Sequence, residues 1–369
     1  MLVTLGVAFV AALVGRTEMW KTFVASVEGE VDYGKDYAVA VAVAFLFPLV
    51  RYALDRTAYT VMANLVVVPS ERKKQLKARS KRNYSEVLKS PPPVLRKRKK
   101  VGGVPAAADS EDLTQEEQEA VDVRVEKFKE SCWKASVYFF FSAYGFVFMR
   151  TKPWFYDRGH FWHGFHDDGP NCQWDHSCPS LCTTDDWPGC STCKFTFDVK
   201  LYYILELGYY LQAIFSLVFW ETRRKDFAVM MGHHIVTIIL IVFSHWGRLL
   251  RIGTMVFLLH DVSDVPLELA KASRYANFDR LTDVFFAFFF LVWILSRIVY
   301  FPLVIIRTAL YEVPKCPRIE WKREYCMVAF DGLLLSLFAI HVYWTFLIGR
   351  ILHRAVVGGK VNDEREDDT

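Results

Sequence analysis

Two groups of ionisable side chains interrupt the most apolar part of this sequence. His233 and His234 are adjacent and open the apolar run "MMGHHIVTIILIVFSHWG". The segment "LLHDVSDVPLELAK" follows and carries His260, Asp261 and Asp264. Imidazole exchanges protons near neutral pH and is also a nucleophile, and a neighbouring carboxylate fixes its tautomer and raises its basicity. These residue types indicate proton transfer or acyl transfer in an apolar environment.

Helix geometry places the two groups at one depth. The histidines begin one predicted membrane span and the acids end the next, so both lie roughly 10 to 15 Å from the same boundary at a rise of 1.5 Å per residue. Asp261, Asp264 and Glu268 are three and four residues apart and share one helix face. The adjacent residues His233 and His234 point about 100° apart, so only one imidazole is expected to face the acids. A polar network that only holds helices together is the structural alternative.

The elements that position these residues follow from the distribution of apolar residues. The chain has 369 residues, of which 53% are hydrophobic, and a formal net charge of +4. The apolar residues form blocks, and a hydrocarbon layer about 30 Å thick needs roughly 20 apolar helical residues to cross it. The sequence therefore predicts an all-α polytopic membrane protein with seven membrane spans. The predicted spans are 37–68 with an amphipathic extension, 131–149, 199–220, 227–246, 249–270, 281–306 and 325–348. Residues 1–36 form an amino-terminal lumenal segment or an extra helix, which would be an eighth span.

Basic connections orient the predicted spans. Lysine and arginine concentrate in three alternate connections, "ERKKQLKARSKR", "ETRRKD" and residues 271–280. Basic connections between spans stay in the cytosol. The linker 69–130 and the acidic tail 351–369 are therefore expected in the cytosol, and the loop 151–198 on the lumenal side. The basic connection at 307–324 counts against this orientation.

The cytosolic linker 69–130 is not expected to bind nucleic acid. A solvated loop next to anionic lipid explains its basic run. Asp109 or Ser110 is expected to cap a helix that leads into the second span, with acids in its first turn.

The lumenal loop holds five of the eight cysteines. They are Cys172, Cys178, Cys182, Cys190 and Cys193. An oxidising compartment favours disulfides, and the odd number leaves one thiol over or paired elsewhere. A zinc site is the alternative, because Cys190 and Cys193 have ligand-like spacing and histidines lie nearby. Neither interpretation predicts a catalytic role for the loop.

A metal ion at the membrane histidines is a further alternative. A di-iron centre lacks ligands, because His260 is the one other histidine near the depth of the pair. A single zinc held by two histidines and an aspartate fits the residue count. We expect a site with no metal ion and no bound cofactor.

The motifs that carry these residues resemble those of the ceramide synthases, members of the TLC-domain family. "HHIVT", "RIGT" and "LLHDVSDVPLELAK" reproduce the family signature with its spacing, and "KFKESCWK", "KPWFYD", "YYILELGYYLQAIFSLVFWETRRKDF" and "FDGLLLSLFAIHVYW" resemble flanking blocks in the same order. The resemblance covers residues 39–350, and the cysteine-bearing insertion after Asp157 departs from it. It implies a catalytic domain at 131–350 whose six helices form a barrel around an acyl chain. Gly253 in "RIGT" is expected to let helices approach closely.

The same resemblance implies a multi-pass enzyme of the endoplasmic reticulum membrane with a cytosolic carboxyl terminus. It would transfer a fatty acyl group from acyl-CoA, as co-substrate, to the amine of a sphingoid base. The catalytic residues it implies are His233, His234, Asp261 and Asp264. An imidazole would either deprotonate the amine or carry the acyl group as an acyl-imidazole. The resemblance favours the covalent route, with His233 as the nucleophile.

Further residues are candidates for substrate binding. Arg223, Arg224 and Lys225 are expected to meet the CoA phosphates, although ordinary cytosolic charge explains them equally well. His260 and Glu268 are candidates within the spans. The expected partners are acyl-CoA, a sphingoid base and membrane lipids, with a homodimer or a small regulatory subunit left open. The alternative function is a non-catalytic TLC-type protein that binds or transports lipids.

Overall fold

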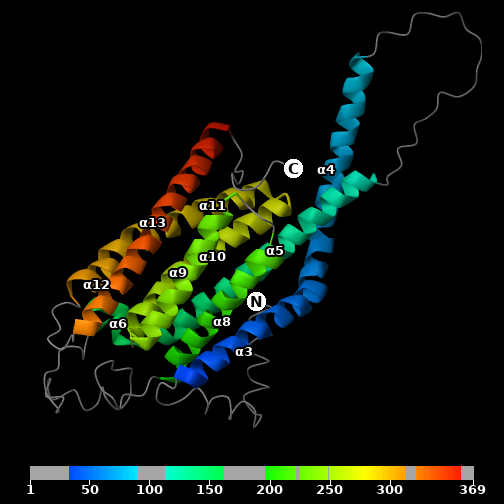
Figure 1. Cartoon of the computed structure of the whole chain (residues 1–369). Helices are drawn as coiled ribbons and strands as arrows, with labels where there is room; N and C mark the ends of the chain where they lie inside the picture. The colour runs from blue at the N-terminus through cyan, green and yellow to red at the C-terminus, as the bar shows by residue number, and fades with distance from the viewer. Residues whose placement is uncertain are drawn as a thin grey trace, which may run out of the picture.

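The computed structural model describes residues 33–89, 113–161, 196–221, 225–247, 249–312 and 321–358. All regular structure in these ranges is helical (Figure 1), which confirms the predicted all-α class. The elements are α3 (Tyr33–Leu54), η1 (Asp55–Tyr59), α4 (Thr60–Lys89), α5 (Gln115–Met149), α6 (Pro153–Tyr156), η2 (Arg158–Phe161), α8 (Phe197–Phe219), α9 (Phe227–Trp246), α10 (Leu250–Tyr275), α11 (Asp279–Trp293), η3 (Ile294–Ile306), α12 (Arg307–Tyr311) and α13 (Trp321–Gly358).

Several predictions concern residues outside these ranges. Residues 1–32 of the predicted amino-terminal segment, residues 90–112 of the basic linker and residues 359–369 of the acidic tail are among them. The disulfide candidates Cys172, Cys178, Cys182, Cys190 and Cys193 also lie outside the described residues.

Five helical stretches of the described chain are long and apolar enough to cross a membrane. They are Tyr33–Arg82, Phe197–Phe219, Phe227–Trp246, Asp279–Tyr311 and Val328–Ala355, at five of the seven predicted places. The other two places hold α5 and α10, which are not among the five. The charged residues Arg251, Asp261 and Asp264 lower the hydropathy of α10. Five spans are therefore supported, and the count of seven and the six-helix barrel stay predictions.

The two ends of the helical bundle differ in what they carry. The carboxyl end of α4, which lies within the predicted linker, and the carboxyl end of α13 are at the same end of the bundle, and the short α6 is at the other (Figure 1). This arrangement agrees with a linker and a tail on one side of the membrane and the 151–198 loop on the other.

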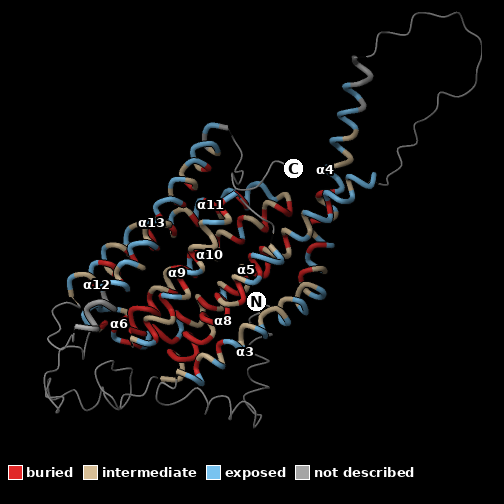
Figure 2. Tube along the Cα trace, in the orientation of Figure 1, coloured by how far each residue is buried: buried red, intermediate tan, exposed pale blue. Residues whose placement is uncertain are grey.

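Helix α10, which carries the predicted acids, lies in the interior of the bundle. It packs along α5 and α11 and also contacts α8, α9 and η3. Buried residues gather on α8 and α10, whereas α3 and α13 present much of their surface outward (Figure 2). The acids therefore sit where neighbouring helices supply their partners.

The interface of α8 and α10 depends on a glycine. The Tyr203 side chain of α8 lies directly against Gly253 of α10, and a Cβ at Gly253 would overlap its hydroxyl group and approach its Cζ atom to 2.7 Å. The Tyr203 hydroxyl also donates a hydrogen bond to Ser244 Oγ at 3.3 Å. The close approach expected from "RIGT" is present.

Helix α5 begins with a capping box. Thr114 Oγ1 accepts a hydrogen bond from the Glu117 backbone N–H at 3.3 Å, and the Glu117 carboxylate accepts one from the Thr114 N–H at 2.9 Å. The expectation that Asp109 or Ser110 caps this helix is wrong, because Thr114 is the N-cap and satisfies the first turn reciprocally with Glu117.

Candidate functional site

A cavity of about 170 Å³ lies inside the bundle, bordered by α5, α8, α9, α10, α11, η3 and α13. Four sequence-predicted site residues line it, namely His233, His234, Asp264 and Glu268. Most of the remaining wall is apolar or aromatic. The structure thus brings both histidines and two of the three acids to one cavity.

Aromatic packing orients the two histidines of α9. The ring centroid of His233 lies 5.1 Å from that of Trp344 on α13, and the two rings meet edge to face. The His234 ring lies 5.7 Å from the Tyr210 ring of α8. Neither imidazole makes a hydrogen bond to another described residue through its nitrogen atoms. Both rings are therefore held in place by packing, with Nδ1 buried and Nε2 left as the ring nitrogen for a ligand.

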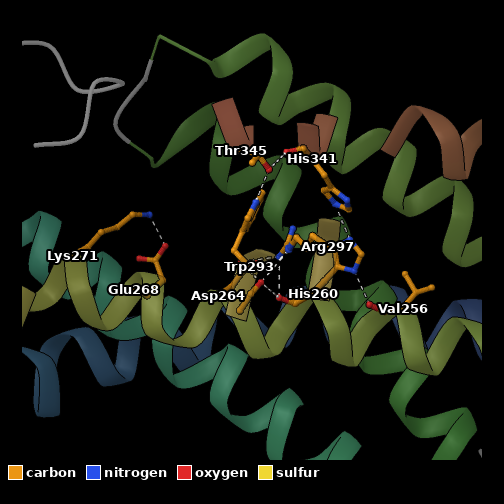
Figure 3. Close-up of polar contacts among 10 residues, drawn as sticks. Val256, His260, Asp264, Glu268, Lys271, Trp293, Arg297, His341 and Thr345 are labelled. Carbon is orange, nitrogen blue, oxygen red and sulfur yellow. Dashed lines mark hydrogen bonds and ion pairs between the residues drawn. The ribbon is translucent and has the colours of Figure 1, made fainter. Parts of the chain in front are cut away.

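Asp264 pairs with an arginine and not with an imidazole. Arg297 of η3 donates from Nη2 to Asp264 Oδ1 at 2.8 Å, and the guanidinium carbon lies 4.4 Å from the centroid of the Trp293 ring (Figure 3). A carboxylate in apolar surroundings needs a counter-charge. The expectation that Asp264 directly orients a histidine is corrected, because η3 supplies this counter-charge.

Asp261 faces a different helix. Its Oδ2 atom accepts a hydrogen bond from the Tyr202 hydroxyl of α8 at 3.3 Å, and Glu206 of α8 also interacts with its carboxyl group. Asp261 does not line the cavity with the histidines. Three residues along a helix rotate the side-chain direction by about 300°, so the directions of Asp261 and Asp264 differ by about 60°. Asp264 therefore reaches the cavity, whereas Asp261 reaches α8. The expected contact of Asp261 with the imidazoles is corrected accordingly.

His260 forms a hydrogen bond with a second buried histidine, His341. Its Nδ1 atom lies 2.6 Å from the Val256 carbonyl oxygen, and its Nε2 atom lies 3.0 Å from Nε2 of His341 on α13 (Figure 3). His260 lines a smaller apolar cavity of about 30 Å³, and Tyr210 lines both cavities. His260 therefore lies behind the main site, and its predicted role in substrate binding stays untested.

The cations expected at the mouth of the site are not those that line it. Arg223 and Arg224 lie outside the described residues, and Lys225 is exposed and does not border the cavity.

Other basic side chains border the cavity instead. Lys134 of α5 contacts Glu221 at 2.7 Å, and Lys271 of α10 contacts Glu268 at 2.6 Å. Arg274, one turn further along α10, also lines the cavity. The predicted site residue Glu268 therefore holds one of the lysines that line the cavity.

The sequence interpretation also missed two buried ionisable residues that interact with the predicted aspartates. Arg297 stands in the apolar run "LVWILSRIVYFPL", and Glu206 stands in "YYILELGYYL". A lone ionisable residue within a span is by default a functional candidate, and this signal would have found both. The aromatic partner Trp344 carries no comparable signal, because aromatic residues are common throughout the spans.

The metal alternative has no support from the geometry of the described chain. Within the ranges given above, no group of three or more histidine, cysteine, aspartate or glutamate side chains is placed to hold a metal ion.

Comparison with known proteins agrees with this arrangement of motifs. A family model described as the TLC domain matches residues 127–350. Ceramide synthase 1 LOH3 of Arabidopsis thaliana is 32% identical over 342 residues, which cover 91% of this chain and 91% of that protein. Ceramide synthase LOH1 of the same plant is 32% identical over 331 residues, 88% of each chain. Ceramide synthase 5 of Homo sapiens is 36% identical over 244 residues, 65% of this chain and 54% of that protein. With the paired histidines and the acids of α10 inside the matched region, the chain is a member of the TLC-domain family.

Proposed function

We propose that this chain is a ceramide synthase that transfers a fatty acyl group from acyl-CoA to the amine of a sphingoid base. Two relatives that span 88% and 91% of the chain carry this name. The observation that carries the proposal is the placement of His233. Its ring lines a largely apolar cavity, is held edge to face by Trp344, and makes no hydrogen bond to the described residues.

The reaction proceeds through an acyl-imidazole on His233. A ring nitrogen of His233 attacks the thioester carbonyl carbon, a C–N bond forms, the C–S bond breaks, and the departing CoA thiolate takes up a proton. The sphingoid ammonium loses a proton to become a nucleophilic amine, and this amine attacks the acyl-imidazole. The amide bond forms as the bond to imidazole breaks, and the amine's second proton passes to the imidazole, where it replaces the proton that the CoA thiolate took up from the ring. His234, on the same cavity, is placed to accept the proton of the amine.

The walls of the cavity suit the two parts of acyl-CoA. Apolar side chains such as Leu267 and Phe289 line the cavity, where they would exclude water from the thioester. Lys134, Lys271 and Arg274 border the cavity beside the basic connections, where the CoA phosphates would lie. This assignment moves phosphate binding from the 223–225 connection to α5 and α10.

The proposed location is the endoplasmic reticulum membrane with a cytosolic carboxyl terminus. The positions of the α4 and α13 ends at one end of the bundle support this orientation. Protease protection of a carboxyl-terminal tag in sealed microsomes tests it, since a lumenal tag would survive digestion.

Release of CoA by the purified protein tests the proposed activity. With a long-chain acyl-CoA and sphinganine, the protein is expected to release CoA and form the N-acylated base in equal amounts. Intact-mass measurement with acyl-CoA alone is expected to show one added acyl group, which His233→Ala abolishes. Ile235→Ala, an exposed position on the same helix, is the matched control. A lipid carrier would release no CoA, and an adduct that persists in His233→Ala would contradict the covalent role of this residue.

A chelator distinguishes the remaining metal alternative. Activity carried by imidazole alone is expected to persist after treatment with EDTA, whereas a zinc-dependent site would lose activity and regain it on addition of zinc.

A further inference from the structure

A buried arginine borders the cavity and is only partly used by its protein partners. Arg297 is 2% exposed and lies within an apolar helix. A guanidinium group has five N–H donors. Nε donates to Ser263 Oγ at 3.0 Å, and Nη2 donates to Asp264 Oδ1 at 2.8 Å and to the His260 carbonyl oxygen at 2.9 Å (Figure 3). Three donors are thus accounted for, and two remain on Nη1.

The Nη1 atom is available to a ligand in the cavity. It makes no hydrogen bond to any described residue, and it is not among the atoms that the surrounding protein closes off. The space that Arg297 lines is the cavity that also contains His233 and His234. Burial of a charged guanidinium group costs free energy, which hydrogen bonds to the protein offset. An arginine with a purely structural role would therefore be expected to use all its N–H donors in bonds to the protein.

Arg297 and His233 belong to one continuous wall of that cavity. The guanidinium group lies over the Trp293 ring, the Trp293 ring lies 6.4 Å from the Trp344 ring, and the Trp344 ring lies 5.1 Å from the His233 ring. The charge of Arg297 is also among those that act on His233. A carbonyl group attacked by His233 therefore lies in the field of this guanidinium group.

We propose that Arg297 is a catalytic residue that donates hydrogen bonds from Nη1 to the acyl carbonyl oxygen during transfer. This inference rests on the proposed function. When the imidazole nitrogen bonds to the carbonyl carbon, the π electron pair moves onto the oxygen and creates an oxyanion. The same charge develops again when the amine attacks the acyl-imidazole. A fixed cation in a water-poor cavity stabilises this charge strongly, because the donor is already oriented.

Asp264 acts through Arg297 as a positioning residue. Its Oδ1 atom holds Nη2, and Ser263 holds Nε, so the guanidinium plane cannot rotate. Nη1 is then the guanidinium nitrogen that faces the substrate. This arrangement gives Asp264 a role in acyl transfer that needs no contact with a histidine.

Arg297→Gln, tested in the full-length protein, separates this role from a structural one. Loss of one oxyanion donor is expected to lower kcat by about 100-fold or more, with little change in KM for acyl-CoA. Affinity for an S-alkyl-CoA, a thioether that has no carbonyl group, is expected to be unchanged, which reports an intact cavity. Arg307→Gln, at an exposed position of the adjoining α12, is the matched control.

Two results would overturn the inference. One is a kcat of Arg297→Gln close to that of the unsubstituted protein, and the other is a parallel loss of kcat and of S-alkyl-CoA binding. If Arg297→Gln does not fold, Arg297→Lys decides by the same two measurements, since it keeps the charge and loses the planar fork. Failure of the unsubstituted protein to release CoA would instead refute the proposed function.

Discussion

Asp264 and Arg297 are joined across two helices by a hydrogen bond of 2.8 Å between Oδ1 and Nη2. The arginine side chain is 2% exposed and the aspartate side chain 21% exposed. The pair lines the same cavity as His233 and His234. The position of the guanidinium group therefore depends on a residue that the family resemblance predicts to be catalytic.

Removal of the Asp264 carboxylate is expected to destabilise the fold as well as to slow acyl transfer. Asp264→Ala leaves Arg297 without its counter-charge, and breaking a buried pair in this way costs about 3 to 5 kcal/mol of the free energy of unfolding. Asp264→Asn keeps a hydrogen-bond acceptor and is expected to cost less. Thermal unfolding in detergent, followed by tryptophan fluorescence, measures both. Asp283→Ala, at an exposed position of α11, is the control, and equal unfolding temperatures for all three variants would contradict the prediction.

The hydrogen bond between His260 and His341 is expected to couple α10 to α13. Because His260 Nδ1 donates to the Val256 carbonyl oxygen, Nε2 of neutral His260 is an acceptor and His341 Nε2 is the donor. His260→Phe or His341→Phe leaves one buried nitrogen unpaired, at a cost of about 1 to 3 kcal/mol. The double variant removes both partners, so its loss is expected to be smaller than the sum of the single losses. Unfolding temperatures that simply add would argue against the bond.

Substitution of Gly253 is expected to separate α8 from α10. Gly253→Ala places a methyl group on the Tyr203 hydroxyl, and overpacking of this kind costs about 1 to 3 kcal/mol. Tyr203→Phe is expected to relieve the clash only in part, because Cζ still lies 2.7 Å from the new Cβ. Gly232→Ala and Gly332→Ala are matched controls, since a Cβ at either position meets nothing within 4 Å. An unfolding temperature for Gly253→Ala as high as for the controls would refute this packing.

Loss of the capping box is expected to fray the start of α5. Thr114→Ala removes the acceptor for the Glu117 N–H and is expected to cost about 0.5 to 2 kcal/mol locally. Hydrogen exchange should accelerate over the first turn of α5 and stay unchanged in the buried part of the helix. Val123→Ala, an exposed substitution further along the same helix, is the control. Unchanged exchange in the first turn would show that the cap does not hold it.

Local sequence was sufficient for the all-α class and for the expectation that both histidines lie near Asp264 and Glu268. The length of the apolar blocks predicted five of the helices that are suited to cross a membrane. Helical periodicity placed His233 and the acids at one depth, because rise and turn per residue are properties of the backbone itself. The capping box at Thr114 was equally local, and the pattern T-x-x-E would have identified it.

The tertiary structure alone decided which partner each of these side chains has. Asp264 meets Arg297, 33 residues away, Asp261 meets Tyr202, 59 residues away, and His260 meets His341, 81 residues away. Periodicity states which residues share a face of one helix, and it is silent about which helix lies opposite that face. The choice among neighbours depends on how all the helices pack together, so a charge within reach in space leaves no trace in the local sequence around the acid.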